Sequence, residues 1–359
     1  MSELRAEIDF ETRSAADLRR CGIYRYAEDP TTSVLCMSWS LGNGPVQRWT
    51  PEMFDPVNLL NHVAAGHTVV AHNANFERQI WGSVLCAREF SHWPRLQIAQ
   101  MDCTQARALA VHLPADLDSL AVVLGLAEKK DDEGHKLMMK MCRPRKVHAD
   151  GTIVWWDEPA MLDRLGAYCD QDVVVESLAD EKLPPLSVEE RRLWELDQVI
   201  NDRGFMLDAS AIERCVDVLE VAQERANVRM AALTNGFVKK VSEALKLVEW
   251  LVSRGIPCES IAKGEHNELT GFADCLGDSV AREVIELRAE AGRNSTAKFK
   301  KMLEVMCADG RAHGTLAFHR ALTGRFGGAL LQPHNLPRTD PDTELPDVLA
   351  AIKIMEQFA

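Results

Sequence analysis

Two acidic residues stand two positions apart near the start of the chain. In Ile8-Asp9-Phe10-Glu11 they alternate with apolar residues. Side chains alternate across a β-strand, so we expect Asp9 and Glu11 to project from one face while Ile8 and Phe10 pack on the other. Acidic residues are mostly exposed in proteins. The segment alone therefore fits a solvent-facing strand as well as it fits two carboxylates that converge on one point.

A third acid follows at a predicted strand-to-helix turn. Residues 69–77 are typical of a strand that ends in a turn and opens a helix, with Asn75 as the predicted N-cap. Glu77 then falls in the first helical turn, where a negative charge complements the helix dipole. A chemical role requires Glu77 to face the same cavity as Asp9.

A phenol and a carboxylate are paired on a later helix. Tyr168 and Asp172 are four residues apart, and so they lie on one helical face, one turn above the other. A surface tyrosine beside a solvated acid would show the same spacing. In isolation, this pair leaves both interpretations open.

Taken in order, these segments resemble the DEDD exonuclease superfamily in its tyrosine form. The resemblance rests on three motifs: D-x-E on the first strand, N-x-x-F-[D/E] at a strand-to-helix turn, and Y-x-x-x-D on a late helix. Residues 101–104, 113–114 and 117–120 are also similar to intermediate segments of that superfamily. One departure is Glu77, because the commonest acid at its position is aspartate. Asp102 and Asp170 are alternative acids nearby.

The resemblance implies a 3′→5′ exonuclease that hydrolyses DNA to nucleoside monophosphates with two divalent cations, Mg²⁺ or Mn²⁺. Such cations, about 3.5–4 Å apart, serve both ends of a phosphodiester displacement. By resemblance, Asp9, Glu11 and Asp172 hold the cation that activates water, and Asp9 bridges to the second. Glu77 assists through metal-bound water, and Tyr168 orients the attacking water.

The most basic stretch of the first half is residues 129–148. A charge run is usually a solvated face. Residues 133–138, however, resemble the G-x-K-L region of exonuclease domains in phage-type polymerases. That similarity places Lys136, together with Asn73 of the second motif, beside a single-stranded 3′ end.

The second half resembles family A DNA polymerases. Residues 194–208 are similar to the start of their polymerase region, residues 295–302 to their thumb helix, and residues 323–338 to their TGR…QNLPR motif. The resemblance implies contacts to primer-template DNA, although a basic solvent face remains open for the lysines. The residues expected to bind DNA here are Arg293, Lys298, Lys300, Lys301, Arg325 and Asn335.

After this motif the sequence does not match the palm and fingers of that family. Asp340, Asp342 and Asp347 lie in a segment unlike the palm motif. We therefore expect no nucleotide polymerisation from this chain alone, and a separately encoded palm and fingers chain is a candidate partner. The alternatives are a non-catalytic DNA-binding fragment or subunit and an RNA-processing DEDD exonuclease.

The elements that must position these residues divide at Leu183-Pro184-Pro185-Leu186, since neither proline continues a helix. We predict an α/β RNase H-like exonuclease domain at 1–184, a mixed sheet flanked by helices. A mainly α-helical partial polymerase region with the thumb follows at 185–330, and the start of a palm at 331–359. The predicted strands are 6–11, 33–41 and 68–71, and the predicted helices are 76–85, 116–124, 162–179, 193–200, 212–233 and 279–306.

Composition sets broad bounds on the class of protein. Hydrophobic residues make up 46% and charged residues 26%, as in folded soluble domains. The net charge of −13 argues against binding nucleic acid through overall charge, but it is compatible with local basic grooves. The ten cysteines include no C-x-x-C pair, which favours reduced and mostly buried thiols over a zinc site. We expect a cytoplasmic protein with no membrane segment.

Overall fold

The computed structural model describes residues 4–42, 44–128, 131–261, 265–293, 297–321 and 323–335. These residues form two compact units: the first contains the chain up to Leu207 together with the segment that begins at Glu304, and the second runs from Asp208 to Leu303. Within the described ranges, no helix combines the length and apolar character that a membrane span needs.

The first unit is built on a mixed five-stranded sheet in the order β3-β2-β1-β4-β5. The strands are β1 (Arg5–Arg13), β2 (Ser33–Leu41), β3 (Gln47–Trp49), β4 (Thr68–Ala71) and β5 (Met101–Cys103). β1, β2 and β3 pair antiparallel, whereas β4 runs parallel to both β1 and β5. The predicted mixed sheet flanked by helices is confirmed, and strands predicted at 33–41 and 68–71 have those bounds.

Helices cover this sheet. They are α1 (Leu18–Glu28), α2 (Val57–Ala64), α3 (Asn75–Gln79) continued by the π-helical segment η1 (Ile80–Glu89), the 3-10 turn η2 (Ile98–Gln100), α4 (Thr104–Ala110), α5 (Leu117–Leu124), α6 (Asp132–Met141), α7 (Pro159–Lys182) and α8 (Val188–Arg203). A short hairpin, β6 (Lys146–Val147) and β7 (Ile153–Val154), lies between α6 and α7. Four tryptophans, Trp39, Trp49, Trp81 and Trp93, are buried in the core, as expected for side chains that bury so much area.

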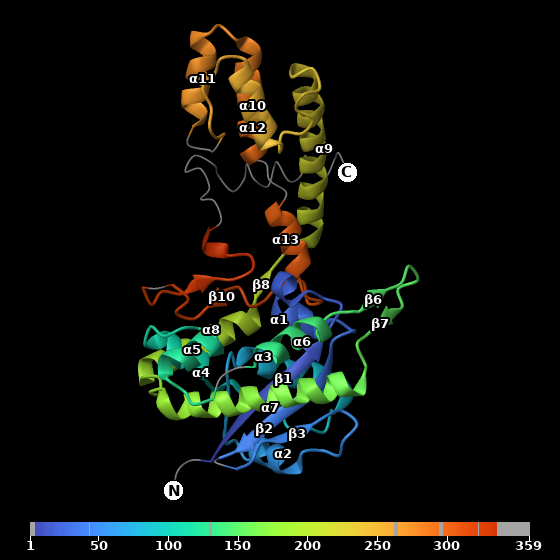
Figure 1. Ribbon diagram of the computed structural model, residues 1–359, viewed down its shortest axis with the longest axis vertical. Helices are drawn as coiled ribbons and strands as arrows, with labels where there is room; N and C mark the ends of the chain where they lie inside the picture. The colour runs from blue at the N-terminus through green and yellow to red at the C-terminus, as the bar shows by residue number, and fades with distance from the viewer. Residues whose placement is uncertain are drawn as a thin grey trace. The chain divides into compact units, whose positions relative to one another are not determined.

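The long helix α7 positions one side of the candidate site. It contacts β1 and β2 and crosses the sheet, as Figure 1 shows. Pro159 opens the helix at its first turn, where a missing N–H costs nothing. The helix ends at Lys182, directly before the break predicted at Pro184 and Pro185.

The second unit is helical and has its own core. Its helices are α9 (Ala209–Leu233), α10 (Ala244–Ser253), α11 (His266–Cys275), α12 (Ser279–Arg293) and α13 (Ala297–Val305). Met230, Leu247, Leu251 and Val284 are fully buried within it. The remaining short elements belong to the first unit: β8 (Phe205–Met206), β9 (Arg311–Ala312), β10 (Leu316–Ala317), β11 (Gly327–Gly328) and the 3-10 turn η3 (Pro333–Asn335).

The division between the compact units falls later than the predicted boundary at 184/185. Helix α8 belongs to the first unit because Trp194, 3% exposed, joins the core of that unit. Arg191 on the same helix donates to the carbonyl of Met101 at 2.6 Å. Residues 336–359, most of the predicted start of a palm, lie outside the described residues.

Helix α8 continues to Arg203, and Gly204, with φ of 62°, ends it. One local prediction was wrong. Asn75 is the first residue of α3 and not its N-cap. Its Oδ1 instead accepts from the Arg78 guanidinium at 3.0 Å, so the side chain is used within the helix.

Candidate active site

Three carboxylates from distant parts of the sequence meet in the first unit. One oxygen each from Asp9, Glu11 and Asp172 lies within 4.8 Å of the other two. Glu11 is 6% exposed and Asp172 is 7% exposed, while Asp9 is half-buried. A solvent-facing strand would expose Glu11, so the burial excludes that interpretation of β1. Three negative charges this close repel one another unless a cation or protons compensate them.

Glu77 lines the same pocket from the first turn of α3. Burial, and then the charge of Asp9, raise the pKa of its carboxyl well above the usual range. Its Oε2 has no hydrogen-bond partner within the part of the chain that the structure describes. Glu77 is not part of the three-carboxylate group, so it borders the cluster instead of completing it.

Tyr168 lies one turn before Asp172 on α7 and is 1% exposed. Burial first, and then the charges of Asp172 and Glu11, raise the pKa of its phenol. The phenol therefore remains protonated and can donate a hydrogen bond. The ring is seated against Gly134 of α6, where an added Cβ would come within 2.5 Å of the Tyr168 ring.

All five predicted catalytic residues line one open pocket of about 350 Å³. Asn73, which adopts a left-handed backbone with φ of 71°, is also at its edge. His135, Met138 and Arg143 of the basic stretch 129–148 also line the pocket, from α6 and the residues after it, although they are not among the predicted site residues. The sequence does contain a signal for the start of α6, because Asp131 is a typical N-cap residue. Its side chain accepts from the Gly134 N–H at 3.0 Å.

Known proteins resemble the chain in both sequence and fold. It is 31% identical over 342 residues to a protein described as a DNA polymerase of Bacillus phage SP02. Its fold matches the POL domain of Pol1 from M. smegmatis, solved in complex with DNA primer-template and dNTP, with a TM-score of 0.56. In sequence, the chain is therefore similar to a phage DNA polymerase. No family model matches it.

The extent of these matches limits what they establish for the polymerase-like chain. The phage match covers 92% of this chain but 51% of the relative, and the solved structure matches 95% of this chain and 53% of that one. The chain thus spans about half the length of these proteins. At 14% identity, the structural likeness shows the fold alone.

The two alternative acids of the polymerase-like chain have structural partners. Asp170 accepts from Ser38 Oγ at 2.6 Å and forms an ion pair with Arg48. Asp102 forms an ion pair with Arg5 at 2.5 Å. Neither lines the pocket of the three carboxylates. These contacts favour structural roles for both residues.

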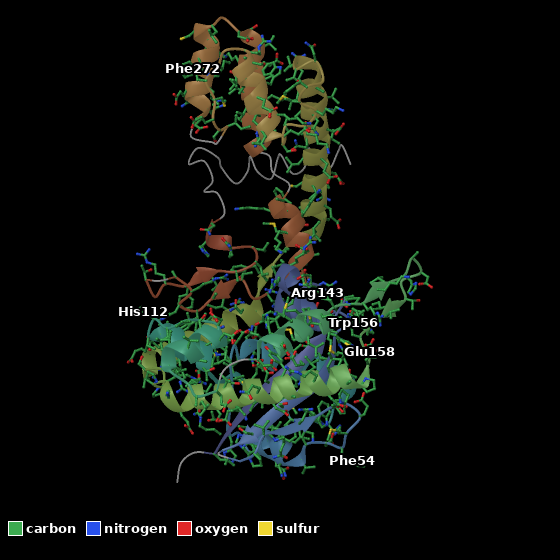
Figure 2. All side chains as sticks on the ribbon, in the orientation of Figure 1. Phe54, His112, Arg143, Trp156, Glu158 and Phe272 are labelled. Carbon is green, nitrogen blue, oxygen red and sulfur yellow. The ribbon has the colours of Figure 1, made fainter. Side chains whose placement is uncertain are left out.

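The predicted basic grip lies partly on exposed surface. Lys136 is exposed on α6, while Lys129 and Lys130 lie outside the described residues. At the base of the β6–β7 hairpin, the Lys140 ammonium and the Arg145 guanidinium lie 3.9 and 4.6 Å from the centre of the Trp156 ring. Figure 2 labels Arg143, Trp156 and Glu158 in this region, and Glu158 pairs with Arg145 at 2.9 Å.

The remaining predicted DNA-binding residues belong to both compact units. Lys298, Lys300 and Lys301 lie on α13, and the Lys300 ammonium is 2.5 Å from a carboxylate oxygen of Glu220. Arg325 and Asn335 are exposed. Arg293 ends α12, but its side chain lies outside the described residues.

Proposed function

We propose that the first unit is an RNase H-like, metal-dependent 3′→5′ exonuclease, in accord with the polymerase-related role of the family. The observation that carries the proposal is the meeting of Asp9, Glu11 and Asp172 within 4.8 Å. Glu77 and Tyr168 share their pocket. The sheet supports the fold assignment, since three antiparallel strands continue into two parallel ones.

The residues present fit divalent cations. Carboxylate oxygens are hard ligands that suit Mg²⁺ or Mn²⁺. Asp9, Glu11 and Asp172 would hold them. The Oε2 of Glu77, which has no hydrogen-bond partner among the residues that the structure describes, would be a further oxygen ligand at the same pocket. When bound, two such cations supply a deprotonated water and stabilise the leaving 3′ oxygen.

The protein side chains then orient the reaction. Tyr168 keeps its proton and donates a hydrogen bond, which fixes the direction of the attacking water. We assign the last nucleotides of a strand to Asn73, which lines the pocket, and to Lys136, which is exposed on α6 and would contact phosphates. The pocket is open, so a strand end can enter from solvent.

The substrate in this proposal is a DNA 3′ end, released as nucleoside monophosphates, and the setting is proofreading in DNA replication. Support comes from the phage relative described as a DNA polymerase and from the solved neighbour, which holds primer-template DNA. Duplex contacts are assigned to the exposed Arg325 and Asn335, to Lys298, Lys300 and Lys301 of α13, and to Arg293.

The test is release of a 3′ label from a single DNA strand with Mg²⁺, by wild type and by Asp9→Ala. We expect Mg²⁺-dependent release that Asp9→Ala lowers by at least ~100-fold, because cation stabilisation of the transition state amounts to several kcal/mol. An RNA strand of the same sequence tests the RNA-processing alternative. Release that survives Asp9→Ala rejects this active site, and no release with retained DNA binding favours the non-catalytic alternative.

A further inference from the structure

A buried thiol on α7 contacts Asp9 of the carboxylate cluster at two points. The Cys169 Sγ lies 3.2 Å from Oδ2 of Asp9 and 3.4 Å from the carbonyl oxygen of the same residue. Cys169 is fully buried and stands 160 positions away from Asp9 along the chain. An S–H group is a weak hydrogen-bond donor, and a carboxylate is a good acceptor for it. The thiol therefore ties α7 to β1 at the cluster.

The spacing on α7 explains why the thiol faces Asp9. Cys169 precedes Asp172 by three residues and Tyr168 precedes it by four, so all three lie on neighbouring parts of one helical face. Tyr168 and Asp172 line the pocket, whereas Cys169 does not. The thiol thus stands behind Asp9, where it can act on the carboxylate but not on a substrate.

A second thiol fixes the direction of the first. Cys36 of β2 is 3% exposed, is the register partner of Glu11 on β1, and shares a hydrogen bond with Cys169. A thiol has a single proton to donate. When Cys169 donates to Asp9, Cys36 must be the donor in the bond between the two thiols. Two thiols then join β2, α7 and β1 in one buried chain of hydrogen bonds that ends at Asp9.

The environment keeps Cys169 in its neutral form. Burial, and then the contact with Cys36, raise the pKa of its thiol well above the usual range, and the charges of Asp9 and Glu11 act in the same direction. A thiolate would add a further negative charge to the cluster. The neutral thiol instead holds a carboxylate without cancelling its charge. Asp102 and Asp170 differ, because they are paired with arginines that offset their charges.

We propose that Cys169 is a positioning residue for the cation site, and that its thiol fixes the orientation in which Asp9 meets the cations. The inference rests on the proposed nuclease, in which Asp9 is the ligand shared by both cations. A side chain that is already oriented does not have to be ordered when a cation binds. Loss of a hydrogen-bond partner behind a metal ligand typically lowers metal affinity by roughly 10–100-fold, and a weak donor belongs at the lower end.

Titration of the full chain with Mn²⁺, followed by electron paramagnetic resonance of the free ion, tests this role without any turnover. Cys169→Ala removes the donor and should weaken Mn²⁺ binding by ~10-fold. Cys169→Ser keeps a donor, so its affinity should stay within about threefold of wild type. Cys86→Ala is the matched control. Cys86 is a buried thiol of the same core, 5% exposed, and its Sγ contacts the carbonyls of Trp93 and Pro94 instead of a carboxylate.

Infrared spectroscopy observes the thiol directly. Adding Mg²⁺ should move one S–H stretching band of the wild type to higher frequency, because a cation draws electron density from the Asp9 carboxylate and weakens its hydrogen bond with the thiol. This responsive band should be absent from Cys169→Ser and present in Cys86→Ala. Thermal denaturation in EDTA shows which variants fold, and if Cys169→Ala does not, the infrared comparison decides.

The outcomes separate this role from the cation site itself. Absence of Mn²⁺ binding by the wild type would reject the proposed cation site, and the role of Cys169 with it. Tight binding by the wild type and equally tight binding by folded Cys169→Ala would overturn the positioning role alone. Equal weakening in the alanine and serine variants would exclude the hydrogen bond as the cause. An S–H spectrum that Mg²⁺ leaves unchanged, in a chain that binds Mn²⁺, would also overturn the proposal.

Discussion

At the scale of single residues, neighbouring acids on α7 have opposite environments. Asp172 is buried beside Asp9 and Glu11, whereas Asp170 is held by Arg48 and Ser38. Residues two apart on a helix point about 200° apart around its axis. The two carboxylates therefore face different surroundings although they share a local sequence.

This contrast gives a matched pair of variants. Asp172→Asn should lower Mg²⁺-dependent 3′ release by at least ~100-fold, because it removes a proposed metal ligand. It should also abolish the rise in melting temperature that Mn²⁺ produces. Asp170→Asn should keep both properties, measured by label release and by thermal denaturation. Equal loss of 3′ release in Asp170→Asn and Asp172→Asn would contradict the assignment of Asp172, and not Asp170, as a metal ligand.

The buried carboxyl of Asp197 should make the free energy of unfolding depend on pH. Burial raises its pKa in the folded protein to about 6, from an ordinary value of 3.8. The folded state then binds more protons than the unfolded state between these values, so the group's contribution to stability falls as pH rises through that window. Asp197→Asn should remove this loss and raise the unfolding free energy at pH 7 by up to about 3 kcal/mol.

The measurement is urea unfolding of wild type and Asp197→Asn at several pH values. The stabilisation should shrink as pH falls through 6 and vanish below 3.8, where the wild-type carboxyl becomes protonated in both the folded and the unfolded state. A gain that is independent of pH would exclude the buried charge as its cause.

At the scale of elements, the packing of α6 on α7 places the phenol in the pocket. Gly134 has no side chain, and Tyr168 occupies the space that a Cβ would fill. Close approach of the two helices thus depends on glycine at this position, despite its cost of about 0.5–1 kcal/mol relative to alanine within a helix.

Gly134→Ala should therefore displace the Tyr168 ring and lower the rate of 3′ release by at least ~10-fold, since a small misplacement of a reacting group is costly. The affinity for Mn²⁺ should change less, because the carboxylates remain in place. Gly82→Ala is the control, as a Cβ there has no heavy atom within 4 Å. Kinetics of label release at saturating Mn²⁺ check the effect, and a full rate for Gly134→Ala would reject this role of the glycine.

At the scale of the whole molecule, the two compact units have separate hydrophobic cores. The core of the first gathers around Ile8, Trp49 and Trp81, and that of the second around Leu247 and Leu251. The cation binding proposed for the first unit would stabilise that unit by mass action. A substitution confined to the core of the second unit should lower the stability of the second unit alone.

Leu251→Ala should destabilise the second unit by ~2–5 kcal/mol, because it removes a fully buried leucine from α10. Metal-dependent 3′ release should remain within about twofold of wild type, as expected for independent sites. Leu245→Ala on the same helix is the control, since Leu245 is 82% exposed. Scanning calorimetry with and without Mn²⁺ measures the result, and loss of 3′ release in folded Leu251→Ala would contradict independent cores.

Local patterns in the sequence determined much of the fold. The strands at 33–41 and 68–71, the helix after Asp116 and the end of α7 before Pro184 follow from alternation, capping and proline, which act within a few residues. The order of the carboxylate segments along the sequence likewise predicted Asp9, Glu11 and Asp172 as members of one site.

Only the tertiary structure decided which residues share a space. It joined Asp9 to Asp172, tied Asp102 and Asp170 to arginines, added α8 to the first unit through Trp194, and left Asp197 buried beside a pocket. The physical reason is that local signals fix the backbone over one or two turns. Burial and charge pairing depend on partners more than a hundred positions away along the chain.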